Sequence, residues 1–93
     1  MAWFLVAIYQ NIYYIKMRAL VQKTDSFNIK STFWICGIDY DSLWYQLDCL
    51  QECSTACGYG NYYDILAFED KGIVKSAYGG NILTNSDIEK LCN

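Results

Sequence analysis

The fold is decided by residues 41–58, which read DSLWYQLDCLQECSTACG. Apolar residues in this stretch recur at the spacing of one helical face. They are Leu43, Leu47, Leu50 and Cys57. Asp41 or Ser42 can cap the first turn, and Gly58 stands where a helix end favours a left-handed residue. The pattern predicts a main helix over residues 41–57.

Strand patterns lie on both sides of this helix. Phe27, Ile29, Phe33 and Ile35 recur at even spacing. Both faces of this segment become apolar near its end, which predicts a central strand covered on each side. Residues 62–69 and 73–78 read as two strands joined by a short hairpin loop in which Gly72 is left-handed. The segment 27–69 therefore predicts a strand, helix, strand crossover of right-handed type.

The most apolar stretch is residues 1–21. Its uninterrupted apolar run covers only residues 1–9, whereas a membrane-spanning helix needs about 20 apolar residues. Residues 12–21 alternate between apolar and polar, so we expect two strands that turn near Gln10 and Asn11. No basic residue precedes Lys16, so a signal peptide is not expected.

The C-terminal segment predicts a second, shorter helix. Residues 79–81 form a turn, and Ser86 and Glu89 match a capping box ahead of a helix that ends at Cys92. A chain of 93 residues leaves no room for a second independent core. We therefore expect one α+β domain over residues 1–93, with a small, mostly antiparallel sheet of about five strands, the main helix packed on it, and a short C-terminal helix.

Charge and composition limit the classes of partner. The net charge is −3, and the seven basic residues are spread thinly along the chain, so duplex nucleic acid is not an expected partner. An acidic domain suits a protein with a basic surface. The five cysteines, without a secretory leader, indicate a reducing, cytoplasmic location with free and mostly buried thiols. Frequent isoleucine, asparagine, lysine and tyrosine suit an AT-rich coding sequence, such as that of a phage or a low-GC bacterium.

Three cysteines, Cys49, Cys53 and Cys57, repeat every four residues along the helix. A metal or iron–sulfur site completed by Cys36 or Cys92 is one interpretation, because thiolates bind zinc and such clusters. Three ligands on one straight helix cannot readily converge on a tetrahedral ion, however. We therefore interpret these cysteines as core residues and expect no metal or cofactor.

Catalytic groups are sparse. The chain has no histidine, which removes the serine–histidine and cysteine–histidine arrangements and the commonest general base. Asp39 and Asp41 could hold magnesium together, but helix capping explains carboxylates at a helix start without a metal. Asp64, in an otherwise apolar strand, is the other acid of interest. We expect no catalytic residues and no enzyme activity.

Aromatic residues provide the main functional signal. The chain has nine tyrosines and three tryptophans, residue types enriched at interface hot spots. Trp44 falls off the apolar stripe of the helix and is predicted to be exposed. The predicted binding surface lies on the outer part of the helix and at its start. Its members are Tyr40, Asp41, Trp44, Tyr45, Asp48 and Glu52.

These features predict a small, acidic, non-catalytic protein-binding module, such as an inhibitor, an immunity-type protein or a phage counter-defence protein. Two alternatives remain. One is a small-molecule or nucleotide-binding domain with an aromatic pocket. The other is a membrane-associated protein anchored by residues 1–21. Edge strands in so apolar a sheet also favour a homodimer.

Overall fold

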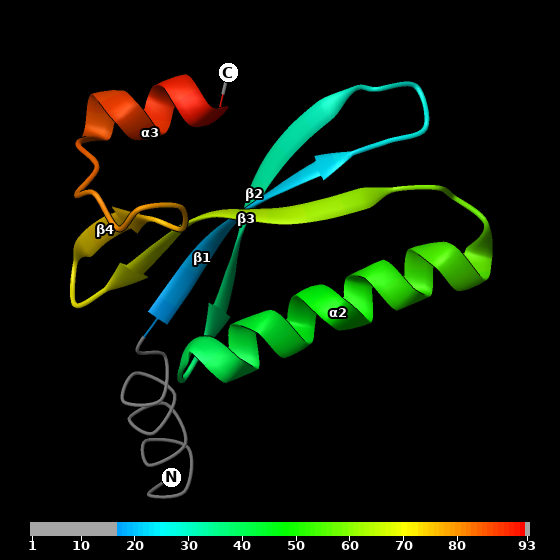
Figure 1. The fold of residues 1–93 in the computed structure, drawn as a ribbon, viewed down its shortest axis with the longest axis horizontal. Helices are drawn as coiled ribbons and strands as arrows, with labels where there is room; N and C mark the ends of the chain where they lie inside the picture. The colour runs from blue at the N-terminus through cyan, green and yellow to red at the C-terminus, as the bar shows by residue number, and fades with distance from the viewer. Residues whose placement is uncertain (1–16, 93) are drawn as a thin grey trace, which may run out of the picture.

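The computed structural model describes residues 17–92. It contains a sheet of four strands, all paired antiparallel, and two helices. In chain order the elements are β1 (Met17–Thr24), β2 (Lys30–Gly37), α2 (Tyr40–Cys57), β3 (Tyr62–Asp70), β4 (Ile73–Ser76) and α3 (Asn85–Cys92). The two helices lie on opposite sides of the sheet (Figure 1). The α+β class, the main helix and the short C-terminal helix are confirmed.

Strand β1 lies in the interior of the sheet, whose order is β2-β1-β3-β4. It pairs along its whole length with β2 on one side and with β3 on the other. Because both pairings are antiparallel, β2 and β3 run in the same direction, and α2 connects them across β1. The expected strand, helix, strand crossover is therefore present. The strand predicted to be central, however, is β2, which forms an edge.

Within residues 17–92 the sheet has four strands, whereas about five were expected. The expected strand over residues 1–9 and the turn near Gln10 and Asn11 lie outside the described residues. Strand β1 also continues beyond the alternating segment 12–21 through Gln22 and Thr24, because both residues pair with neighbours on each side. Pairing with β2 and β3 outweighs the weak strand preference of these polar side chains.

The turn between β1 and β2 takes up residues that were expected to belong to a strand. The Asp25 carboxylate accepts hydrogen bonds from the N–H groups of Phe27 and Ile29, both at 2.9 Å. Asn28 has a left-handed φ of 63°. An aspartate that binds backbone N–H groups ahead of it stabilises a turn instead of a strand. Strand β2 therefore begins at Lys30, and Phe27 is 84% exposed.

Each face of the sheet carries its own apolar core. Side chains of β1 and β3 pack against α2 on one face: Met17, Ala19, Val21, Ile65, Leu43 and Leu47. The opposite face is smaller and is closed by α3. Its cluster comprises Leu20, Ala67 and Val74, with Trp34, Leu66, Leu83, Ile88 and Leu91 packed around it. The two clusters explain why β1 is apolar on both sides.

The hairpin of β3 and β4 turns as predicted, with Lys71 and Gly72 both in the left-handed region at φ 52° and 80°. Strand β4 ends at Ser76, not Tyr78, because Ser76 turns to donate its N–H to the Asn81 carbonyl. This brings residues 81–83 back alongside β4.

The capping box of α3 differs from the predicted pair of Ser86 and Glu89. Thr84 Oγ1 accepts the N–H of Asp87 at 3.3 Å, and the Asp87 carboxylate accepts the N–H of Thr84 at 3.0 Å. The helix consequently begins at Asn85. The Thr84 N–H and the Thr84 hydroxyl both donate to the Asp87 carboxylate, and these two hydrogen bonds lower the pKa of Asp87. The capping pair thus lies two residues earlier than the sequence pattern indicated.

Residues 17–21, the described part of the apolar N-terminal stretch, lie in the sheet as buried strand β1, with Arg18 only partly covered. These five residues are therefore part of the sheet. Among residues 17–92, neither helix combines the length and the apolar character needed to cross a bilayer.

Candidate functional site

Helix α2 carries all six predicted site residues, and its first turn is set by Asp39. The Asp39 carboxylate accepts the N–H of Ser42 at 2.8 Å, and Ser42 Oγ accepts the N–H of Asp39 at 3.4 Å. This reciprocal pair is a capping box. The expectation that Asp41 or Ser42 is the N-cap is wrong, since the helix begins at Tyr40, one residue before the predicted boundary. Asp41 lies in the first turn, where its negative charge interacts favourably with the positive end of the helix dipole.

The backbone passes very close to this cap at Gly37. A Cβ atom at Gly37 would lie 2.3 Å from Ser42 Oγ and 3.1 Å from Leu43 Cδ2. Only glycine therefore fits between β2 and the first turn of α2. At the other end Gly58 has φ 74° and closes the helix, as predicted.

The inner side of α2 holds the helix against the sheet. Leu43 and Leu47 are buried as expected, whereas Leu50 is only partly buried and Cys57 is exposed. Ser54 takes the remaining buried position, and its hydroxyl accepts the Asn61 N–H at 3.0 Å. The helix thus uses hydrogen bonds with the following loop where the sequence stripe predicted a thiol.

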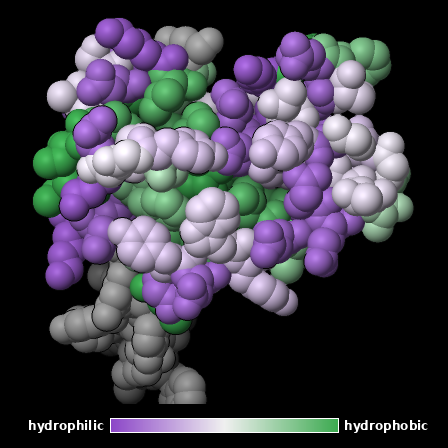
Figure 2. All heavy atoms as spheres, viewed as in Figure 1, coloured by the Kyte–Doolittle hydropathy of each residue, from purple (hydrophilic) through white to green (hydrophobic). Residues whose placement is uncertain are grey.

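The six predicted residues are all exposed. At 100° per residue, Asp41, Tyr45, Asp48 and Glu52 fall on the side of α2 opposite the buried leucines. We call these four the outer face of α2. Figure 2 shows pale aromatic rings and purple hydrophilic side chains beside a strip of hydrophobic residues on the drawn side of the molecule.

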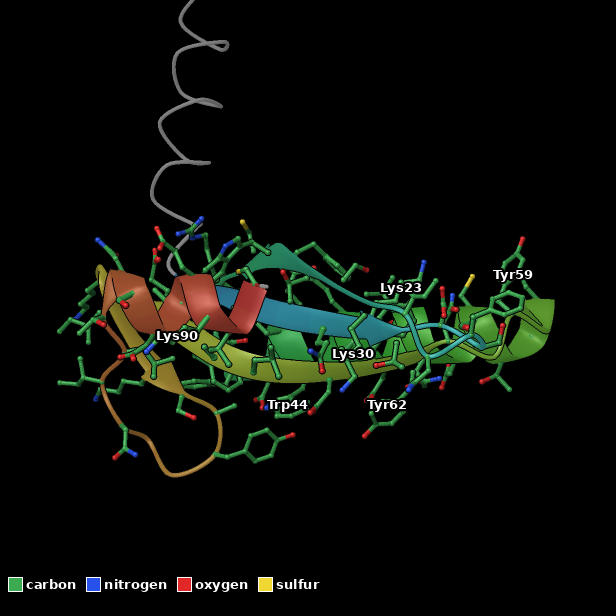
Figure 3. The ribbon with its side chains drawn as sticks, turned by 90° about the horizontal axis from the view of Figure 1, so that it is seen from above. Lys23, Lys30, Trp44, Tyr59, Tyr62 and Lys90 are labelled. Carbon is green, nitrogen blue, oxygen red and sulfur yellow. The ribbon has the colours of Figure 1, made fainter. Side chains whose placement is uncertain are left out.

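Tyr40 and Trp44 form a separate aromatic group that leans toward β3. The Phe68 ring meets Tyr40 edge-on at a centroid distance of 4.9 Å and Trp44 at 6.1 Å with a tilted geometry. Tyr40 and Trp44 nevertheless remain 50% and 43% exposed. Figure 3 shows Trp44 projecting from the opposite side of the ribbon to Lys23. Exposure of Trp44, predicted from its place off the stripe, is confirmed.

Phe68 is a residue of this surface that sequence reasoning missed. It read as one apolar position of a strand, and no local signal shows that it meets two rings of α2. A hollow of about 160 Å³ adjoins Tyr40 and Phe68, and its other lining residues are Asp70, Lys71, Ile73 and Lys75. The aromatic group therefore borders two cations of the β3–β4 hairpin.

Tyr45 is the most exposed aromatic residue of the six, at 69%. Interaction with the Cys49 thiol one turn later raises the pKa of Tyr45, and the nearby Glu52 charge raises it further. Tyr45 is therefore protonated at neutral pH and can offer a hydrogen bond from the outer face. The three carboxylates around it are acceptors only.

The outer face also accounts for the charge of the protein. Helix α2 contains three acidic residues, Asp41, Asp48 and Glu52, and no lysine or arginine. These three charges equal the net charge of −3, so the rest of the chain carries equal numbers of acidic and basic residues. The excess negative charge of the protein is thus concentrated on one exposed helical face.

The cysteines are not core residues. All five, including Cys49, Cys53 and Cys57, are free and exposed. At 100° per residue, Cys49 and Cys53 fall about 100° or more from the direction of the buried leucines, and Cys57 is the last residue of α2. Across residues 17–92, no cluster of three or more cysteine, aspartate or glutamate side chains is placed to hold a metal ion.

A larger hollow lies beyond the C-terminal half of α2, with a volume of about 340 Å³. Tyr59 and Tyr63 supply aromatic surface, Lys23 a positive charge, Asn61 an amide and Cys53 a thiol. Tyr59 lies at one end of the molecule, whereas Lys90 of α3 lies towards the other (Figure 3). None of the six predicted residues lines this hollow.

Asp64, the isolated acid in a strand, has a structural partner. Its carboxylate accepts a hydrogen bond from the Tyr78 hydroxyl at 2.5 Å. This bond raises the pKa of Tyr78 to about 12. This hydrogen bond joins the loop after β4 to β3, away from the outer face of α2.

Comparisons of the chain with protein-family models, with curated proteins and with solved structures returned no significant match. The functional argument therefore depends on the site itself.

Proposed function

We propose that this protein is a non-catalytic protein-binding module that acts through the outer face of α2 and the adjoining Tyr40 and Trp44. The supporting observation is that one helix carries three exposed aromatic rings together with three exposed acids that equal the net charge of the protein. Carboxylates steer association with a basic partner, and tyrosine and tryptophan supply rigid contact area. An inhibitor or immunity-type protein of a phage or low-GC bacterium fits this description.

The rings and the charged groups of this surface contribute to binding in different ways. Tyr40 and Trp44 are held against Phe68, so their exposed edges are already ordered before binding. Ordered rings lose little side-chain entropy in a complex. Tyr45, Asp48 and Glu52 stand further out and provide one donor and several acceptors to a basic surface. The rings supply the apolar contact, and the acids supply orientation and association rate.

The test is affinity capture from the native host with three immobilised proteins: the wild type, Tyr45→Ala and Tyr59→Ala. Tyr59 is 66% exposed, which closely matches Tyr45, but it lies in the loop after α2. We expect one protein to be retained by the wild type and by Tyr59→Ala, and to be lost by Tyr45→Ala. Equal retention by both variants, or the recovery of no partner, would contradict the proposal.

Charge provides a second measurement on the captured complex. Neutralising Asp48 and Glu52 together to Asn and Gln should lower the association rate and weaken its dependence on salt, because these charges steer the encounter. An association rate that does not change in this variant would refute the electrostatic part of the proposal.

The hollow beside Tyr59 and Tyr63 favours a second candidate function, the binding of a small planar ligand. Its volume of about 340 Å³ lies within the usual range for ligand sites. Native mass spectrometry of the purified protein tests this candidate. A mass above that of the bare chain supports it, and the bare mass of 10.8 kDa or a simple multiple opposes it.

A further inference from the structure

The sheet has two edge strands, β2 and β4, and they differ in how they are covered. The outer edge of β4 is occupied by its own chain. Ser76 donates its N–H to the Asn81 carbonyl, and Leu83 donates its N–H to the Val74 carbonyl, each at 2.8 Å. Within residues 17–92, the outer edge of β2 has no comparable backbone partner.

The hairpin identifies which groups of β2 face outward. Asp25 donates its N–H to the Ile29 carbonyl at 3.0 Å. From Ile29 onward, every second residue exchanges backbone hydrogen bonds with β1. The residues between them direct their N–H and C=O groups away from β1. The outward set is Lys30, Thr32, Trp34 and Cys36.

Both ends of this edge are closed. Gln46 Nε2 donates to the Cys36 carbonyl at 2.7 Å, so a side chain of α2 covers the edge at Cys36. The hairpin turn at residues 25–29 closes the other end. The open edge therefore consists of Lys30, Thr32 and Trp34, and Thr32 is its centre. The open edge contains no proline, and Lys30 is its only charged residue. Proline and charged side chains are the features that usually prevent an edge strand from pairing with another chain.

We propose that two copies of this chain pair antiparallel through β2, about a two-fold axis at Thr32. The two four-stranded sheets then form one continuous sheet. The proposed occupant is a second copy because the open edge is complementary to itself. Thr32 lies opposite Thr32 of the second copy, and Lys30 lies opposite its Trp34. Each outward N–H and C=O of the three residues then has a partner.

Side chains on both faces support this register. Threonine pairs are favourable across strands, and the lysine stem can cover an indole edge. On the α2 face, Ile29 lies opposite Ile35 of the second copy. Ile29 is 64% exposed in the single chain, so pairing covers apolar surface that is otherwise in water.

This inference is independent of the proposed function of α2. The outer face of α2 points away from the sheet, so a dimer presents two copies of it. The paired segment is short, so the interface belongs to the small class that dissociates on dilution. Any disulfide between exposed cysteines would imitate a dimer, so reducing conditions are required.

The first experiment measures the mass of the full chain by native mass spectrometry and analytical ultracentrifugation over a dilution series with reductant. We expect twice 10.8 kDa at high concentration. Thr32→Pro should be monomeric and folded, because it removes an N–H that no hydrogen bond among residues 17–92 uses. Phe33→Pro is the matched control, and it should lose stability because it removes a hydrogen bond to β1.

The second experiment tests the axis without proline. Thr32→Lys and Thr32→Glu each place like charges opposite each other at the axis, so each variant alone should be monomeric. Mixing the two variants in equal amounts should restore the dimer. A wild type that is monomeric throughout, a Thr32→Pro protein that remains dimeric, or a mixture that stays monomeric would each overturn the proposal.

Discussion

Replacing Asp39 tests the start of α2, on which the candidate surface depends. In Asp39→Ala the Ser42 N–H loses its acceptor at 2.8 Å, and the helix N-terminus loses a negative charge. Loss of an N-cap costs about 0.5–2 kcal/mol, and loss of the charge costs about 0.3–1 kcal/mol. We therefore expect the free energy of unfolding to fall by about 0.8–3 kcal/mol.

Two matched variants separate these contributions. Asp39→Asn keeps an oxygen acceptor and should lose only the charge contribution, about 0.3–1 kcal/mol. Asp41→Ala loses a charge in the first turn but gains helix propensity of about 0.5 kcal/mol, so it should be nearly neutral. The order of stability should be Asp41→Ala above Asp39→Asn above Asp39→Ala.

Urea unfolding followed by circular dichroism measures this series. The midpoint should fall while the slope with urea concentration stays constant, because the surface exposed on unfolding does not change. For a domain of this size, about 1 kcal/mol corresponds to about 4–8 °C in Tm. If Asp41→Ala lost as much stability as Asp39→Ala, the sequence-based cap would be correct and the capping geometry described above would be wrong.

Three further measurements follow from particular side chains. Leu43 is fully buried between α2 and the sheet, so Leu43→Ala should cost about 2–5 kcal/mol in urea unfolding; a loss below about 1 kcal/mol would contradict its burial. The five exposed cysteines should all react with a thiol reagent in the folded protein; fewer than five without denaturant would show that some are buried after all. The hydrogen bond from Tyr78 to Asp64 raises the pKa of Tyr78 in the folded protein to about 12. Because this value lies above the pKa of about 10 in the unfolded chain, the hydrogen bond stabilises the fold fully below about pH 10. This contribution to stability is lost as the pH rises through the folded-state pKa. Ultraviolet titration of the wild type against Tyr78→Phe should show that the tyrosine missing from the variant is one that ionises late, and a missing tyrosine that ionises near pH 10 would refute this shift.

Local elements were predictable because neighbouring residues encode them. The helix over Tyr40–Cys57 begins one residue before the predicted range, and the β3–β4 hairpin turns at Gly72 as expected. Leucines at helical spacing and a glycine with positive φ act through the nearest turns of the chain. The exposure of Trp44 followed from the same periodicity. These features needed no knowledge of distant contacts.

Other features depend on residues that are far apart in the chain. The interior place of β1 follows from its pairing with β3, which lies beyond β2 and α2 in the chain, as Met17 opposite Asp70 illustrates. The meeting of Phe68 with Tyr40 and Trp44 arises in the same way. The cysteines were misplaced because small apolar thiols suit either a core or a surface, and only the packing angle of α2 distinguishes the two.

The sequence by itself determined the class of the fold, its main helix, its hairpin and the residues that face away from the leucine stripe. The tertiary structure decided which strand is interior, which carboxylate caps α2, and which edge of the sheet stays open. The physical reason is range. Helical periodicity and turn chemistry act between residues a few positions apart, whereas strand order and edge exposure result from hydrogen bonds and packing between segments that the sequence separates.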